Sequence, residues 1–126
     1  MNFSPELWRG ESRVITLTCV DPDTGLPANL SSGKWLVSTV EWQIKSTLEA
    51  PDPPILSKSL AGGGIVLAAQ SGDTMGKLDI FVLPADTASI APGSYTHDVV
   101  AGFASGARVY LVKPSGLAIL GVVNQL

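Results

Sequence analysis

Apolar and polar residues alternate with a period of two along most of this chain, and no segment shows a sustained helical period of 3.6. The clearest case runs from Val37 to Lys45. There Val40, Trp42 and Ile44 point to one face, and the residues between Val40 and Lys45 on the other face are polar. Such alternation is typical of antiparallel strands that bury one side. The pattern predicts an all-β protein with Trp42 at the centre of its core.

Eight short segments are predicted to be strands, separated by turns rich in Gly, Pro, Asp and Ser. Turn signals that recur every ~8 to 12 residues are typical of a two-sheet sandwich. We therefore predict one domain over residues 1–126, an immunoglobulin-like antiparallel β-sandwich of about 7 to 9 strands. The predicted strands are Arg13–Val20, Val37–Lys45, Ile55–Leu60, Gly64–Ala68, Lys77–Leu83, Ser94–Phe103, Ala107–Val112 and Leu117–Val123.

A predicted corner follows the strand that ends at Leu83. Pro84 with Asp86 and Thr87 suits a short helical corner, and the Pro-Gly pair that ends at Gly93 redirects the chain before the next strand. Tyr95 comes just after this corner. In immunoglobulin-like sandwiches, a Tyr at this place donates a hydrogen bond to the backbone upstream. We expect the same of Tyr95.

Composition narrows the classes of function. The chain has 126 residues and a net charge of −3, and its eight basic residues are scattered from Arg9 to Lys113, which argues against nucleic-acid binding. No apolar run approaches the roughly 18 residues of a membrane span, so no membrane partner is expected. The N-terminus lacks the pattern of a signal peptide. The single Cys19 excludes an internal disulfide and fits a reducing compartment.

The turn Asp21-Pro22-Asp23-Thr24-Gly25 partly resembles a calcium-binding loop, because carboxylates two residues apart can share a cation. An EF-hand loop also needs a bidentate Glu at its twelfth position, where this chain has Ser32. We therefore predict a plain turn, without a metal, and we expect no cofactor elsewhere.

His97 lies beside Asp98 and close to Ser94, which invites a search for a catalytic triad. Neighbouring residues on a strand point to opposite faces, so His97 and Asp98 do not face each other locally. We predict a partly buried His97 that is hydrogen-bonded to the backbone or to a Tyr. No other nucleophile or base pattern is visible, and the chain is predicted not to be an enzyme.

Trp8 and Trp35 lie near predicted turns, where their rings can be exposed. Exposed aromatic rings stack on sugars, so these two residues are candidate surface aromatics of a glycan-binding module. Packing at the rim of the core is the alternative.

Two predicted strands carry apolar residues on both faces, although a two-layer sandwich buries only one face of each strand. We predict that the surplus residues form a subunit interface, and a corner loop folded over them is the alternative. The candidate interface consists of Phe81, Leu83, Ala118, Leu120 and Val122.

The order and spacing of these features resemble an immunoglobulin-like module of tailed-bacteriophage virion proteins, including the N-terminal domain of baseplate upper proteins. The last strands from Val109 to Val123 are similar to that module's final hairpin. The other matching segments are Trp8 to Ser12, the Asp and Gly turn before Leu30-Ser31, Val40 to Ile44, Gly63 to Ile65, and Asp86 to Asp98.

This resemblance implies a structural protein of the virion, assembled in the host cytoplasm and located at the tail or baseplate. Its implied partners are other virion structural proteins, and we expect a homo-oligomer. A capsid-decorating or head-surface protein is the alternative within this class, and a glycan-binding module is the alternative from another class. Contacts with partners are expected to vary at the turn Asp21–Pro27 and the loop Ser46–Pro54.

Overall fold

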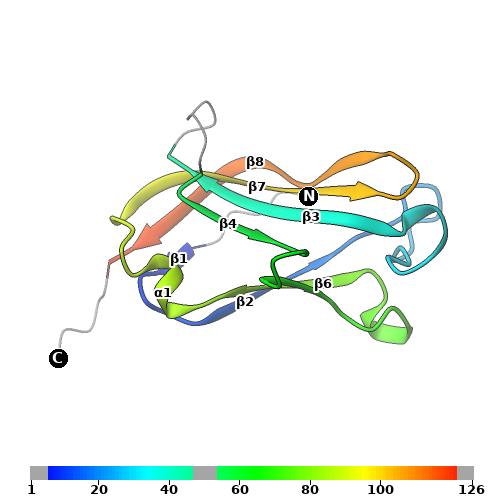
Figure 1. Ribbon diagram of the computed structural model, residues 1–126, viewed down its shortest axis with the longest axis horizontal. Coiled ribbons are helices and arrows are strands. Elements are labelled where there is room, and N and C mark those ends of the chain that lie inside the picture. Colours follow the sequence, from blue (N-terminus) through cyan, green and yellow to red (C-terminus); the bar gives the residue numbers. More distant parts are fainter. Residues whose placement is uncertain (1–5, 47–53, 122–126) are drawn as a thin grey trace.

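The chain forms two β-sheets packed face to face, as seen in the computed structural model (Figure 1), which describes residues 6–46 and 54–121. A five-stranded sheet has the order β1-β8-β7-β3-β4, and a three-stranded sheet has the order β2-β6-β5. The strands are β1 (Glu6–Trp8), β2 (Arg13–Thr18), β3 (Val37–Lys45), β4 (Leu56–Ser59), β5 (Ile65–Leu67), β6 (Lys77–Val82), β7 (Gly93–Phe103) and β8 (Arg108–Leu120). Three short helices join them, η1 (Gly33–Trp35), η2 (Gly72–Thr74) and α1 (Pro84–Thr87).

This strand order confirms the predicted immunoglobulin-like sandwich. The sheet of β3, β7 and β8 corresponds to strands C, F and G of that fold, and β2, β6 and β5 correspond to strands B, E and D. One pairing departs from the prediction of antiparallel strands, because β1 runs parallel to β8. β1 itself escaped the sequence analysis, since three residues are too short for a periodic pattern. Its middle residue Leu7 is fully buried.

The core lies between the sheets and is built from the residues that the alternation placed inward. Trp42 is 1% exposed at the centre of β3, opposite the buried Val99 of β7. From the other sheet, Ile15 and Ile80 face it as a register pair, and both are buried. Trp42 is therefore a central core residue, as predicted.

The predicted division into two strands, Ala107–Val112 and Leu117–Val123, is wrong, because β8 is one continuous strand of 13 residues from Arg108 to Leu120. The break was expected at Lys113 to Gly116, where Pro114 seemed to end a strand. In the structure His97 pairs with Ser115 and Val99 pairs with Val112, so two residues of β8 bulge opposite Asp98. Pro114 lies in that bulge, where its missing N–H is not needed for the ladder.

The predicted corner is confirmed, and its polar contacts tie three parts of the chain together. The Asp86 carboxylate accepts a hydrogen bond of 2.7 Å from the Leu83 N–H and caps α1. The same carboxylate lies 2.7 Å from the Lys58 ammonium of β4, and both side chains are largely buried. Thr87 is fully buried, and its hydroxyl accepts the Gly10 N–H. The corner thus holds β4 and the segment after β1.

Tyr95 forms the expected hydrogen bond, its hydroxyl donating to the Ala91 carbonyl across the corner. Replacing Tyr95 with Phe removes this bond and keeps the ring, so we expect the free energy of unfolding to fall by about 1 kcal/mol. Urea denaturation followed by circular dichroism measures the change. Tyr110→Phe is the matched control, since Tyr110 is exposed. Equal effects of the two substitutions would contradict this role of Tyr95.

Candidate functional site

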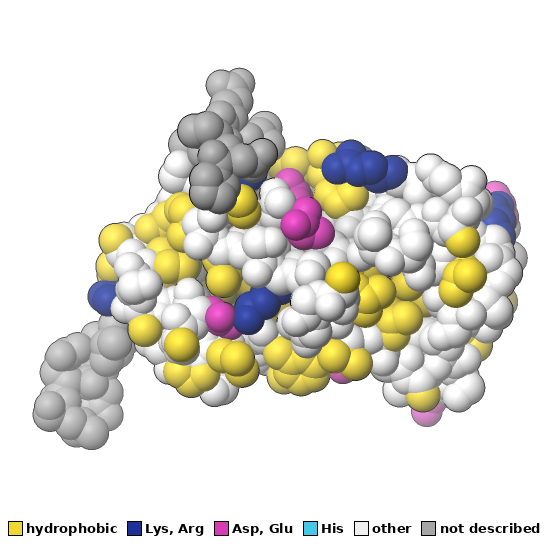
Figure 2. Space-filling model, viewed as in Figure 1, with side chains coloured by type: hydrophobic (Ala, Val, Ile, Leu, Met, Phe, Trp, Pro, Cys, Tyr) yellow, Lys and Arg dark blue, Asp and Glu magenta, His cyan; other side chains and the backbone are white. Residues whose placement is uncertain are grey.

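The outer face of the three-stranded sheet carries a group of exposed apolar side chains. Val14 of β2 and Phe81 of β6 are register partners, and they are 52% and 36% exposed. Val66 of β5 is exposed on the neighbouring row, and Leu83 is exposed just after β6. In Figure 2 hydrophobic side chains gather along the lower margin, over the layer that β2 and β6 form in Figure 1. We call Val14, Val66, Phe81 and Leu83 the outer apolar patch.

The other predicted interface residues lie elsewhere. Ala118 and Leu120 of β8 are half-buried, and they alternate with the buried Leu117 and Ile119. They therefore point away from the core on the outer face of the five-stranded sheet, and Val122 lies outside the described residues. The five residues do not form one surface, because Phe81 and Leu83 are on the opposite side of the sandwich.

The two candidate surface aromatics are also separated. Trp8 is 38% exposed and pairs with Leu120 at the end of β8. Trp35 in η1 is half-buried, and its ring meets Phe103 edge-on at 5.1 Å, near the start of β8. A strand of 13 residues spans about 40 Å, so the two indoles do not serve one sugar-binding platform.

His97 is more deeply buried than predicted, at 1% exposed. Its Nδ1 accepts a hydrogen bond of 3.0 Å from the indole Nε1–H of Trp42, a partner that the sequence analysis missed. Asp98 points to the other face and is half-buried, and burial is the main cause that raises the pKa of its carboxyl. Ser94 is exposed. The three residues of the suspected triad are not brought together.

The loop from Asp21 to Gly25 is a hydrogen-bonded turn. The Asp21 carboxylate accepts the Asp23 N–H at 2.8 Å, which is the main cause that lowers the pKa of Asp21. The indole of Trp35 and the ammonium of Lys34 lower it further. The Asp23 carboxylate pairs with Lys34 at 2.9 Å. Among residues 6–46 and 54–121, no three His, Cys, Asp or Glu side chains gather as a metal site would require.

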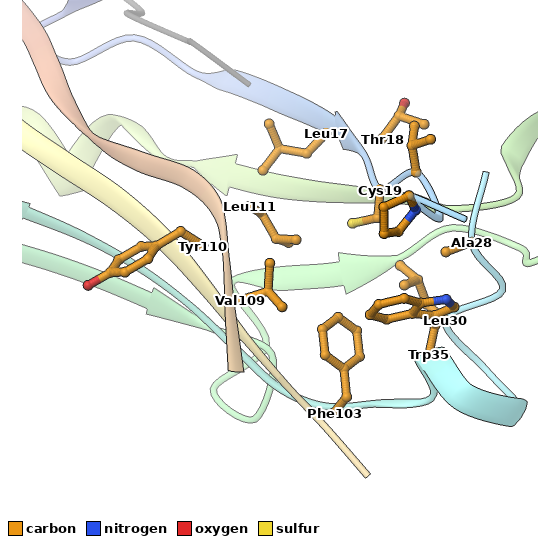
Figure 3. Close-up of a pocket in the computed structure, with 12 residues that line it drawn as sticks. Leu17, Thr18, Cys19, Ala28, Leu30, Trp35, Phe103, Val109, Tyr110 and Leu111 are labelled. Carbon is orange, nitrogen blue, oxygen red and sulfur yellow. The ribbon is translucent and has the colours of Figure 1, made fainter. Parts of the chain in front are cut away.

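An apolar cavity of about 370 Å³ opens at the end of the sandwich where β8 begins (Figure 3). Residues at the end of β2, around η1 and at the β7–β8 turn form its wall. Figure 3 shows Leu111 and Val109 on one side and Trp35, Leu30 and Phe103 on the other. We call this space the end cavity. It went unpredicted, because its residues come from distant parts of the chain.

Cys19 is buried in the wall of the end cavity, and burial raises the pKa of its thiol from 9.0 to about 11. Only the thiolate reacts with disulfide reagents, so at pH 8 we expect the folded protein to react at least about 100-fold more slowly than the unfolded protein. Rates of colour release from Ellman's reagent, with and without urea, measure this ratio. Glutathione in both buffers corrects for the solvent. Equal rates would contradict a buried thiol.

A second, more polar hollow of about 350 Å³ lies on the outer face of the five-stranded sheet. Ser59, Glu41, Val100 and Tyr110 form one row across four strands, through successive register pairs. Arg108 lines the hollow, and its guanidinium lies 5.8 Å from the exposed Tyr110 ring. Polar groups therefore stand beside an exposed aromatic ring on this face.

No protein-family model matches this chain, and no curated protein sequence is significantly similar to it. In the part of the chain that the structure describes, no helix is long and apolar enough to cross a membrane. The fold places the chain among immunoglobulin-like β-sandwiches. A fold of this kind carries many functions, so a function has to be argued from its surfaces.

Proposed function

We propose that this chain is a non-enzymatic structural protein of a tailed-bacteriophage virion and serves as a protein–protein docking module at the tail or baseplate. It assembles in the host cytoplasm, forms a homo-oligomer and contacts other virion structural proteins. The virion assignment is supported by the resemblance of the ordered sequence segments, and the docking role by the outer apolar patch.

The outer apolar patch is the observation that carries the docking role. Val14 and Phe81 face each other across the strand pair, and Val66 and Leu83 extend the exposed surface. Single exposed apolar residues are ordinary, but several on one sheet face favour a covered surface. Complete burial of a fully exposed apolar side chain contributes roughly 1.5 to 3 kcal/mol, so covering the exposed part of each patch residue favours association.

A second apolar region on the far side favours one kind of oligomer. Trp8 and Leu120 are register partners on the edge of the five-stranded sheet, with Ala118 beside them. A subunit with apolar residues on two opposite faces suits head-to-tail contacts, which close into rings when the rotation allows. A capsid-decorating or head-surface protein would use the same surfaces, and remains the alternative in this class.

The polar hollow favours a second candidate function, glycan binding. Its Glu41 and Arg108 side chains offer hydrogen bonds. Tyr110, which lines the end cavity, lies beside Arg108 and offers a ring for stacking. Trp8 and Trp35, the candidate aromatics for this function, lie at opposite ends of β8 and do not contribute jointly. Saccharide titration of the isolated chain, with Tyr110→Ala as the comparison, separates this function from docking.

Phe81→Lys is expected to convert a defined oligomer into a folded monomer, because the charge is placed in the middle of the outer apolar patch. Light scattering gives the mass, and circular dichroism checks the fold. Gln43→Lys adds the same charge to the polar outer face of β3 and is expected to leave the oligomer intact. Leu120→Lys distinguishes head-to-tail contacts from other contacts. Head-to-tail contacts use both apolar regions, so they are lost with Phe81→Lys and also with Leu120→Lys. A monomeric wild-type protein would contradict self-assembly.

A further inference from the structure

The end cavity is larger than the voids that ordinary core packing leaves. Protein interiors are packed like organic crystals, with few voids that exceed a water molecule. Here a hollow of about 370 Å³ opens to solvent beside the buried centre of the same core. The volume lies within the usual range of small-molecule sites, which are mostly apolar and largely preformed. We propose that the end cavity binds a small, uncharged or positively charged aromatic compound of one or two rings.

The volume sets the size of the ligand. An apolar cavity of about 150 Å³ in a protein core accommodates benzene. The end cavity has about 370 Å³, so it has room for two fused rings. The wall also limits polarity, because most of it is apolar. Its polar side-chain groups are the Thr18 hydroxyl, the weakly donating Cys19 thiol, the Trp35 indole N–H and the Tyr110 hydroxyl. The ligand therefore exposes few polar groups to the wall.

The aromatic wall favours a ring over an aliphatic group. Trp35 and Phe103 meet edge-to-face at an interplanar angle of 80°, and both line the cavity. Aromatic rings prefer edge-to-face or offset contacts with further rings, beyond the effect of buried area. Figure 3 shows both rings on one side, opposite Leu111 and Val109, so a flat ligand fits between an aromatic and an aliphatic wall.

The charges beside Val20 and Pro22 disfavour anions on that side of the mouth. Val20 and Pro22 line the cavity, and Asp21 lies between them in the chain. The Asp21 carboxylate accepts the Asp23 N–H at 2.8 Å, which favours its ionised form. Asp23 is paired with Lys34, so Asp21, Asp23 and Lys34 together leave one net negative charge, two acids against one base. A ligand with a carboxylate is repelled there, and one with an ammonium is attracted.

NMR titration of the ¹⁵N-labelled protein with indole tests the site. Binding is expected to shift the amides of Cys19, Trp35 and Leu111, and tryptamine is expected to bind at least as tightly as indole. Indole-3-acetate is expected to bind about 3-fold more weakly than indole, because its carboxylate is repelled by the one net negative charge beside the mouth. Absence of shifts at these amides, or tighter binding of indole-3-acetate than of tryptamine, would overturn the proposal.

Two filling variants locate the site. Ala28→Phe places a ring in the wall, and Val109→Trp places one at the exposed rim, so that one variant is available if the other does not fold. Each is expected to weaken indole binding at least tenfold. Gln43→Ala, on the polar outer face of β3, is expected to leave binding unchanged. Unchanged binding in a folded filling variant would overturn the site. The oligomer measurement is independent, so failure here leaves the docking proposal standing.

Discussion

Gly76→Ala is expected to lower the free energy of unfolding by about 2 to 4 kcal/mol, because both the backbone angle and the space at this residue exclude a side chain. Gly76 has φ = +79°, a left-handed conformation that costs an L-residue about 1 to 2 kcal/mol. An added Cβ would also lie 2.6 Å from the Cys19 carbonyl oxygen and 3.1 Å from the Pro27 side chain. Urea denaturation followed by circular dichroism measures the loss.

The backbone around Gly76 has little freedom to move away from that contact. The Cys19 carbonyl accepts the Ala28 N–H at 2.9 Å, and the Gly76 carbonyl accepts the Cys19 N–H at 2.8 Å. Relief of the contact therefore strains or breaks hydrogen bonds that hold the end of β2. Gly25→Ala is the matched control, since Gly25 has φ = +73° but nothing within 4 Å of an added Cβ. A loss for Gly76→Ala that only equals the control would refute the steric part.

Trp42→Phe is expected to cost about 2 to 4 kcal/mol, the second large effect. The smaller ring leaves a cavity at the centre of the core, and such cavities destabilise in proportion to their volume. The substitution also removes the indole N–H that His97 accepts at 3.0 Å. The loss of the donor to this buried acceptor accounts for about 1 to 3 kcal/mol of the total. Trp8→Phe, at a ring that is 38% exposed, is the control and is expected to cost less than about 1 kcal/mol.

A double-mutant cycle separates the hydrogen bond from the packing. Trp42→Phe, His97→Leu and the double variant are compared by urea denaturation, with circular dichroism as the signal. We expect the double variant to lose at least about 1 kcal/mol less free energy of unfolding than the sum of the two single losses. The reason is that His97→Leu removes the Nδ1 acceptor that Trp42→Phe leaves without its indole donor. Additive losses would show that the Trp42–His97 bond contributes little and that packing alone accounts for the effect of Trp42→Phe.

The inward faces of the long strands were predictable from the sequence, and the strand ends were less so. Ile80 and Trp42 lie where alternation placed them, since burial of one face leaves a periodic trace. Pro114 was wrongly predicted to lie in a turn, because proline is common both in β-bulges and in loops. β1 was missed for a different reason, since its burial rests on Leu7 alone. Tertiary pairing, and not local preference, decides both cases.

Surfaces were harder to predict than the core. Phe81 and Leu120 were rightly placed away from the core, but their position on opposite sides depends on which sheet each strand joins. The end cavity gave no local signal, since residues near Trp35 and residues near Leu111 meet only after the sheets have packed. For His97, the sequence predicted its position on a strand but did not predict that Trp42 is its hydrogen-bond partner.

The parallel pairing of β1 with β8 determines how the domain responds to a pulling force. Glu6 is opposite Ala118 and Trp8 is opposite Leu120, so the two strands point the same way along one edge. A tension applied at the two ends of the chain pulls β1 backwards and β8 forwards, and the hydrogen bonds between them are loaded together in shear. The Arg9 N–H, bonded to the Leu120 carbonyl at 3.0 Å, extends that row. A force along the chain therefore loads several hydrogen bonds at the same time, and these bonds do not break one after another.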